Sequence, residues 1–321
     1  MKKRIICLAL AALMVLSAFA FTGCGEKKAN DKYVVGICQL VQHAALDAAT
    51  QGFMDALNEA LPGKVEFQNK NASGEANNCA TIVNGFVSDK VDLIMANATP
   101  ALTAAVSATK DIPILGTSIT AYGVALDIAD FSGTVGGNVS GTSDLADLSA
   151  QAAMITEWFP ETKKVGLLFC SAEPNSRYQI EEVAKYLADK GVETKEFAFT
   201  DTNDVTAVTQ AAADYADVIY IPTDNTAAAN TEAIANVLVP AKVPAICGEE
   251  GICSGCGVAT LSISYYDLGV TTGKMAAKIL TGETDISKMP IEYTSATKKY
   301  NASMCDALGI KPLDGYTAIG E

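Results

Sequence analysis

Histidine and arginine are nearly missing from this sequence of 321 residues, which holds one histidine, His43, and two arginines, Arg4 and Arg177. The chain also lacks a GxSxG nucleophile elbow, an HExxH pair and a GxxxxGK phosphate loop. A glycosidase needs two carboxylates, and no recognisable pair stands out. A zinc site would need a second ligand pair beside the one CxxC motif. These absences predict a protein that is not an enzyme and has no catalytic residue, metal or cofactor.

Basic residues are few as a class. The chain has 23 Lys and Arg against 37 Asp and Glu, a formal net charge of −14. Nucleic-acid phosphates need a basic face, so this balance argues against nucleic acid as a partner. It equally disfavours adhesion of the folded body to an anionic membrane.

The first 32 residues predict export and a lipid anchor. Residues 1–23 combine a basic start, an apolar stretch and the small residues Thr22-Gly23, as in a bacterial lipoprotein signal peptide. Cys24 would then be acylated, and residues 24–32 are polar enough for a flexible tether. Loss of the three basic residues of the signal leaves 20 Lys and Arg against 37 acids, a net charge of −17. We expect a protein anchored to the outer face of the bacterial cytoplasmic membrane.

Seven cysteines remain beyond Cys7 and Cys24. Most lie inside apolar runs, where cysteine behaves as a small buried hydrophobe. Cys253-Ser-Gly-Cys256 is different, because an exported CxxC can close a small local disulfide. The sequence leaves the redox state of this pair open.

Strand-like and helix-like segments alternate along the rest of the chain. Residues 33–57 predict one βα unit, with an apolar run, a polar turn at 39–43 and apolar residues at helical spacing. The alternation stops over 122–144, which is rich in Gly, Ser, Thr and Asp and predicts a crossover loop, and then restarts. The pattern predicts an α/β protein of two lobes with parallel sheets. We expect a first lobe of 33–142 plus about 264–292, a second of 143–263 plus about 293–321, and a multi-strand hinge beside a cleft.

Seven segments, in this order, resemble the substrate-binding lipoproteins of ABC importers, above all the family associated with tryptophan, tyrosine and other aromatic amino acids. They are GICQLVQHAALDAATQGF, IMANATPA, GNVSGTSD, FCSAEPNS, VIYIPTDNTAAA, CGEEG and SISYYDLGVTTGKMAAKIL. The resemblance implies a type I periplasmic-binding-protein fold with two Rossmann-like lobes. It also implies a monomer that traps a small ligand between the lobes and delivers it to an ABC permease and its ATPase.

The resemblance also implies a set of contact residues at the lobe edges. Those of the first lobe are Gln39, His43, Thr99 and Asn138, and those of the second are Glu173, Asn175, Ser176, Thr223, Asp224, Asn225, Glu249 and Glu250. For His43 we expect hydrogen bonding or stacking on the ligand rather than catalysis.

A free amino acid would bring a carboxylate and an ammonium into this cleft, and both need partners there. Thr99 and Ser118 lie at predicted helix starts, where hydroxyls and free N–H groups favour an anion. Asp224, and after it Glu249, could neutralise the ammonium. Asp224 and Thr99 could equally be helix N-caps. An aromatic ligand also needs a flat apolar surface, for which the candidates are Tyr122, Tyr265 and Tyr266.

Other functions stay open at this point. The fold does not fix its ligand, so a sugar or nucleoside receptor is an alternative. Arg177 is the only arginine after the signal, which favours a ligand that needs no guanidinium. A lipoprotein that feeds a sensor and, from a different class, a cleft enzyme such as a glycosidase are further alternatives.

Overall fold

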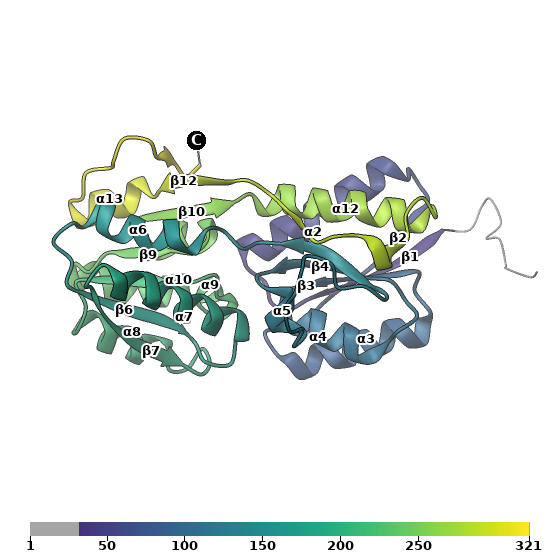
Figure 1. The fold of residues 1–321 in the computed structure, drawn as a ribbon, viewed down its shortest axis with the longest axis horizontal. Helices are drawn as coiled ribbons and strands as arrows, with labels where there is room; N and C mark the ends of the chain where they lie inside the picture. Colours follow the sequence, from purple (N-terminus) through teal and green to yellow (C-terminus); the bar gives the residue numbers. More distant parts are fainter. Residues whose placement is uncertain (1–31, 321) are drawn as a thin grey trace, which may run out of the picture. The chain divides into compact units, whose positions relative to one another are not determined.

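The computed structural model describes residues 32–320, and these residues form two mostly parallel β-sheets covered by helices (Figure 1). The first sheet has the strand order β11-β5-β4-β3-β1-β2 and the second β13-β12-β10-β9-β8-β6-β7. All pairs are parallel except β10 with β12. The predicted α/β fold with two parallel-sheet lobes is thereby confirmed, and Cys24 lies outside the described residues.

The strands are short and mostly buried. Those of the first sheet are β1 (Tyr33–Gln39), β2 (Val65–Asn71), β3 (Leu93–Asn97), β4 (Ile114–Ile119), β5 (Val139–Ser143) and β11 (Glu292–Tyr293). Those of the second sheet are β6 (Lys164–Cys170), β7 (Glu193–Phe199), β8 (Val218–Ile221), β9 (Ala245–Cys247), β10 (Ala259–Ile263), β12 (Ala296–Tyr300) and β13 (Thr317–Ala318).

The helices mostly follow the strands one by one. Around the first sheet lie α2 (Ala44–Ala60), α3 (Ala76–Asp89), α4 (Thr99–Ala108), α5 (Tyr122–Ala125), α12 (Tyr265–Leu280) and the 3-10 turn η1 (Ile286–Lys288). Around the second lie α6 (Leu148–Trp158), α7 (Pro174–Asp189), α8 (Val205–Ala213), α9 (Asn225–Ala229), α10 (Thr231–Ala241), α11 (Glu250–Cys256) and α13 (Ala302–Leu308).

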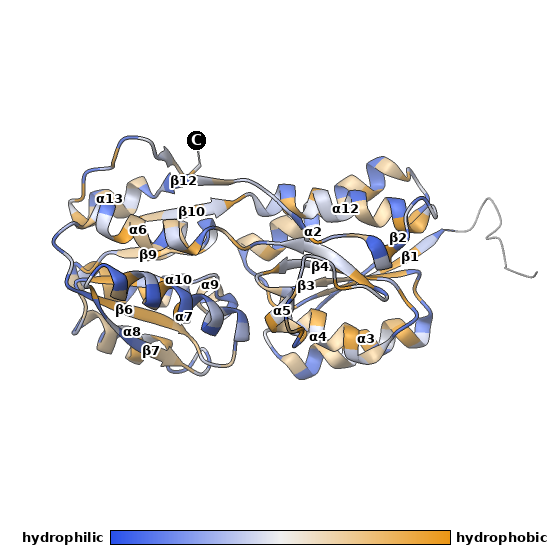
Figure 2. Ribbon diagram, viewed as in Figure 1, coloured by the Kyte–Doolittle hydropathy of each residue, from blue (hydrophilic) through white to orange (hydrophobic). Residues whose placement is uncertain are grey.

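Hydrophobic burial explains why these segments became strands. Every residue of β3, LIMAN, and of β8, VIYI, is buried, as expected for strands covered on both faces. Figure 2 shows the hydrophobic colour along β6, whereas β12, near the edge of the second sheet, carries hydrophilic colour. Each sheet has its own core, so each lobe can hold its half of a site rigidly.

Helices α2 and α12 pack unusually closely, although more than 200 residues separate them in the chain. Gly269 of α12 lies against the backbone of Ala49, and Gly52 of α2 lies against the backbone of Tyr266. A Cβ at either glycine would overlap a carbonyl oxygen. The chain therefore returns to the first sheet through α12 before it enters the second sheet again.

The chain passes between the two sheets three times: after β5, after β10, and between β11 and β12. The segment 264–292 thus contains α12 and the start of β11, while 293–321 contains β12, α13 and β13. We retain the lobe boundaries expected from the sequence as a proposal.

Residues 122–144 differ from the prediction of a crossover loop, because they contain β5, a fully buried strand inside the first sheet. Its sequence, VSGTS, has too few large apolar residues to be recognised. In the structure its polar side chains find partners instead. The hydroxyl oxygen of Thr142 lies 3.2 Å from that of Thr117 and 2.8 Å from that of Thr272.

All seven described cysteines are free and buried. The disulfide that the sequence left open between Cys253 and Cys256 is not formed in the structure, and both residues lie in α11, where the Cys256 thiol donates to the Ile252 carbonyl at 3.3 Å. Helix geometry explains the free thiols, because Cβ atoms three positions apart in a helix are about 5–6 Å from each other, farther than the roughly 3.5–4.5 Å that a disulfide requires.

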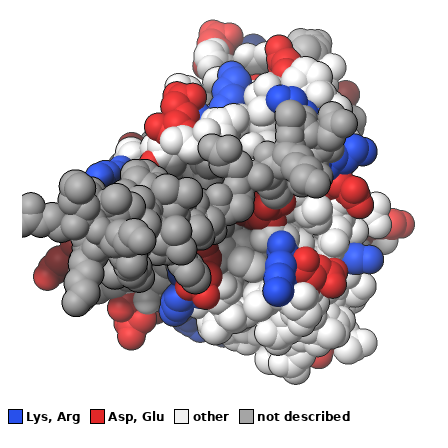
Figure 3. Space-filling view, turned by 90° about the vertical axis from the view of Figure 1, so that its right-hand side faces the viewer, with Lys and Arg blue, Asp and Glu red and all other residues white. Residues whose placement is uncertain are grey.

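Charged side chains are mixed on the surface. On the face drawn in Figure 3, the lysines stand singly among acidic and uncharged residues. Within residues 32–320, no helix has the length and apolar character needed to span a membrane.

Candidate functional site

A small pocket lies where turns from both sheets meet. The strand orders β2-β1-β3-β4-β5 and β7-β6-β8-β9-β10 are equivalent, so each sheet has a switch point next to its first strand. Ligands of such sheets bind beyond the carboxyl ends of the strands near this point. The pocket has a cavity volume of about 10 Å³ and is lined by His43, Leu46, Ser118, Thr120, Asp144, Asn175, Thr223, Asp224, Asn225, Ala228, Glu249 and Tyr265.

Seven residues expected at the site from the sequence line this pocket. They are His43, Ser118, Asn175, Thr223, Asp224, Asn225 and Glu249. Tyr265, a candidate aromatic surface, lines it as well. Tyr122 is instead buried with its hydroxyl on the Thr142 carbonyl, and Tyr266 is 43% exposed beside Asp55.

Six expected contact residues are not among the lining residues, and one of them, Glu250, is described below together with Glu249. Gln39 is buried and uses its amide within the first lobe, donating to Asp47 and accepting from Thr50. Asn138 lies at the opposite, amino end of β5, where it donates to the carbonyl of Ile112 at 2.8 Å. These two side chains hydrogen-bond to neighbouring residues of the first lobe and do not line the pocket.

The other three are buried beneath the pocket wall. Thr99 is the first residue of α4, and the Ser176 hydroxyl donates to the Thr223 carbonyl at 3.4 Å. Glu173 accepts hydrogen bonds from the backbone N–H groups of Asn225 and Thr226, and therefore fixes the start of α9.

Two polar lining residues, Thr120 and Asp144, were not predicted as site residues. Thr120 directly follows the end of β4, whereas Asp144 ends the segment 122–144, which the sequence predicts as a crossover loop. The sequence signal that could have identified Asp144 is its position directly after Gly-Thr-Ser at the end of a strand. The small polar side chains of that strand made it hard to recognise.

Four buried polar atoms with no hydrogen-bond partner among the described residues belong to residues that line this one pocket. They are His43 Nδ1, Ser118 Oγ, Asp144 Oδ1 and Asn175 Oδ1. Ser118 also has a backbone φ of 56°, a left-handed conformation that is unfavourable for a non-glycine residue and often found at functional sites. An unpaired buried polar atom costs about 1–3 kcal/mol, so this set indicates a place for a polar ligand.

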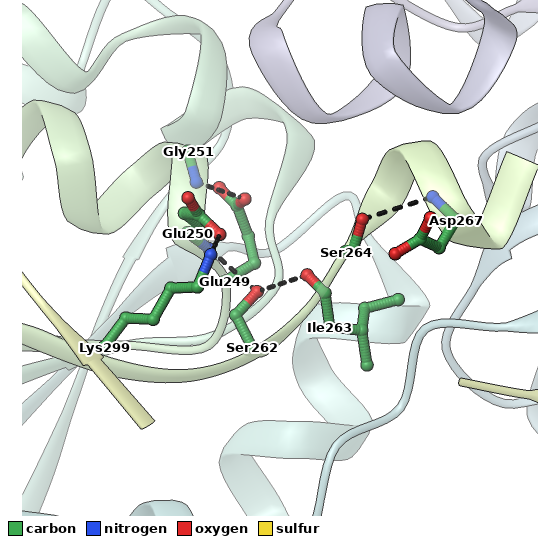
Figure 4. Close-up of polar contacts among 8 residues, drawn as sticks. All are labelled: Glu249, Glu250, Gly251, Ser262, Ile263, Ser264, Asp267 and Lys299. Atoms are coloured by element: carbon green, nitrogen blue, oxygen red, sulfur yellow. Dashed lines mark hydrogen bonds and ion pairs between the residues drawn. The ribbon is translucent and has the colours of Figure 1, made fainter. Parts of the chain in front are cut away.

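The carboxylates of Asp224 and Glu249 already have partners on both oxygens. Asp224 accepts from the N–H groups of Cys170 and Ala227, at 2.7 and 2.8 Å, and is the N-cap of α9. Glu249 accepts from the N–H groups of Gly251 and Ile252 as the N-cap of α11 (Figure 4). The alternative role of Asp224 as a helix N-cap is confirmed, and each oxygen of both carboxylates already accepts a backbone hydrogen bond.

Burial raises the pKa of both capping carboxyl groups. The pKa of Glu249 rises to about 7, and that of Asp224 rises as well, helped by the nearby charge of Glu173. Glu250, the neighbour of Glu249, points elsewhere and pairs with Lys299 at 2.6 Å (Figure 4).

Asp144 is the one lining carboxylate with an oxygen free. Its Oδ2 accepts from the Tyr265 hydroxyl at 2.9 Å, while Oδ1 has no partner. Burial raises the Asp144 pKa to about 6, partly offset by the hydroxyls of Tyr265 and Thr120. No lysine or arginine lines the pocket. Asp144 is therefore a buried negative charge suited to a ligand cation.

Comparison with known proteins gives the family. A family model for ABC transporter substrate-binding proteins matches residues 34–312. A "Tyrosine-binding protein" from Clostridioides difficile (strain R20291) is 33% identical over 313 residues, which cover 92% of this chain and 89% of that protein.

Solved structures agree with this result. The crystal structure of an ABC domain in complex with L-Trp, from Streptococcus pneumonia, has a TM-score of 0.85 at 29% identity, covering 90% of this chain and 100% of the other. The ligand-free, open structure of a substrate-binding protein with adhesive properties from Clostridium difficile has a TM-score of 0.68 at 32% identity, covering 89% and 99%. At similar identity, the present structure resembles the L-Trp complex more than the open form.

Proposed function

Because this chain belongs to the family of ABC transporter substrate-binding proteins, we propose that it captures an aromatic amino acid in the pocket between its two sheets and delivers it to an ABC importer. The single observation that carries the choice of ligand is the free oxygen of Asp144 in a pocket without basic side chains. The L-Trp complex and the tyrosine-binding protein among the relatives support it.

In this proposal the amino acid binds by its charged end near β4 and β5. The ammonium group donates to Asp144 Oδ1, and the carboxylate accepts from the Ser118 hydroxyl, which has no other partner among the described residues. An anion can be bound by neutral donors because hydrogen bonds to a charged group are strong in a buried site. Asp144 thereby takes the role that the sequence assigned first to Asp224, whose oxygens are occupied.

The proposal is tested by calorimetry of the purified protein with the twenty amino acids, a set of sugars and a set of nucleosides. We expect binding of L-tryptophan or L-tyrosine. Binding of sugars or nucleosides alone would contradict the proposal and would favour another ligand for the same fold.

The affinity for L-tryptophan should depend on pH through Asp144. The carboxyl group must be ionised to hold the ammonium, and its pKa is about 6, so the proton competes with the ligand below that pH. We expect a constant affinity well above pH 6 and a fall of up to about tenfold per unit below it. Titration calorimetry at pH values above and below 6 measures how the affinity depends on pH. The Asp144→Asn variant should lack the fall, and a wild-type profile that rises toward acid pH would exclude this role.

We further propose that the protein works outside the cytoplasm as a monomer and is held at the membrane by a lipid on Cys24. The support for the anchor is the sequence of residues 1–24 alone, which precedes the described part of the chain. The family supports an extracytoplasmic place.

A further inference from the structure

The pocket has two polar ends, and the second one is not used by the charged group of an amino acid. Asp144 follows β5, Thr120 follows β4 and Ser118 lies near the end of β4, whereas His43 follows β1. In the order β5-β4-β3-β1, the strands β5 and β1 are three spacings apart, roughly 14 Å. Asn175 and Asn225 follow β6 and β8 of the second sheet. Leu46 and Ala228 complete the lining with apolar surface.

Glu173 sets the direction of both amides at this second end. It accepts from Asn225 Nδ2 at 2.6 Å and from Asn175 Nδ2 at 3.2 Å. Asn175 Nδ2 also donates to the Thr223 carbonyl at 3.1 Å. Because carboxylate and carbonyl oxygens accept only, the amide nitrogens must face them. The Asn175 Oδ1 atom is thereby left facing the pocket as an acceptor.

The same network fixes the tautomer of His43. Its Nε2 atom lies 3.4 Å from Asn225 Oδ1, an acceptor, so Nε2 carries the hydrogen. Burial lowers the His43 pKa, so the ring is neutral and Nδ1 is an unprotonated acceptor. His43 Nδ1 and Asn175 Oδ1 both lack a partner within residues 32–320. The side chains of His43, Asn175 and Asn225 therefore offer two free acceptors and no free donor at this end of the pocket.

We infer that His43 Nδ1 and Asn175 Oδ1 bind a hydrogen-bond donor on the ligand's ring, so that the protein selects aromatic amino acids with an indole N–H or a phenol O–H over those without one. This inference rests on the proposed function and names the ligand class more narrowly. A site built to bind an O–H or N–H discriminates strongly against the analogue that lacks it, because its acceptors are then buried unpaired.

The test compares matched ligands on the wild-type protein. We expect L-tyrosine to bind at least tenfold more tightly than L-phenylalanine, and L-tryptophan at least tenfold more tightly than L-benzothienylalanine, whose sulfur replaces the indole N–H. Equal affinities within each pair would overturn the inference and leave the proposed function standing. Binding of none of the four would instead refute the proposed function itself.

A substitution of His43 tests whether this residue causes the preference for a ring with a hydrogen-bond donor. His43 precedes α2 and makes no side-chain cap, so His43→Phe keeps a ring and leaves the helix start intact. We expect the tyrosine preference over phenylalanine, measured as the ratio of the two affinities, to fall at least fivefold. The control is Gln42→Ala at the exposed neighbour, which should keep the preference. An unchanged preference in His43→Phe would exclude His43.

The tautomer can be observed directly, because His43 is the only histidine of the chain. Nitrogen NMR of the protein saturated with L-tryptophan should show a neutral ring protonated at Nε2. A ring protonated at Nδ1, or at both nitrogens at pH 8, would overturn the inference without any variant.

Discussion

Replacement of Asp144 by asparagine is expected to weaken binding of L-tryptophan or L-tyrosine by about 30- to 150-fold, or about 2–3 kcal/mol, because the ammonium group loses its only free carboxylate oxygen. The substitution keeps the shape of the side chain and its contact with the Tyr265 hydroxyl. Titration calorimetry at pH 7.5 measures the loss. An affinity within threefold of wild type would show that the ammonium binds elsewhere.

A matched control lies three residues further on. Asp147 is an exposed carboxylate that caps α6 through the N–H groups of Ser149 and Ala150, and asparagine is an equally good cap. Asp147→Asn should leave affinity unchanged. Ligand-free Asp144→Asn should melt no lower than wild type at pH 7.5, because burial without a positive partner makes the ionised form unfavourable in the folded protein. A lower melting temperature would point to damaged folding.

Substitution of Gly269 by alanine is expected to destabilise the protein by about 1–3 kcal/mol or more, since the new Cβ would overlap the Ala49 carbonyl oxygen and push α12 away from α2. The melting temperature should fall by roughly 3–8 °C. Thermal unfolding followed by circular dichroism measures the change.

The control for Gly269 is another glycine inside a helix. Gly85 lies in α3, and nothing lies within 4 Å of where its Cβ would be. Gly85→Ala should leave stability unchanged or raise it by about 0.5–1 kcal/mol, because alanine is the better helix former. Equal effects of the two substitutions would show that helix propensity, and not the α2–α12 contact, determines the result.

The sequence was informative where hydrophobic periodicity was strong. Buried strands such as LIMAN and VIYI are unmistakable, and the βα alternation they create led to two lobes with parallel sheets. The strand β5 could not be found in this way, since VSGTS is neither apolar nor alternating. Its place in the sheet depends on Thr117 and Thr272, which lie far from it in the chain.

The turns that form the site were predictable, but the direction of each side chain was not. Position after a strand end correctly brought His43, Asn175 and Asp224 to the pocket. The position after a strand end did not reveal that both oxygens of Asp224 accept hydrogen bonds from backbone N–H groups. It also did not reveal that Gln39 accepts a hydrogen bond from Thr50 inside the first lobe. The direction of each side chain depends on hydrogen-bond partners distant in sequence. These partners determine which carboxylate of the pocket can bind a ligand.

In the proposed binding mode, the raised pKa of Asp144 couples ligand binding to the release of a proton. Near pH 6 part of the ligand-free population holds a proton on this carboxyl group, and an arriving ammonium can take its place only by displacing it. Capture therefore releases acid, and an acidic surrounding favours release of the ligand. A cell that acidifies its surface would thus load this protein less completely at the same amino-acid concentration.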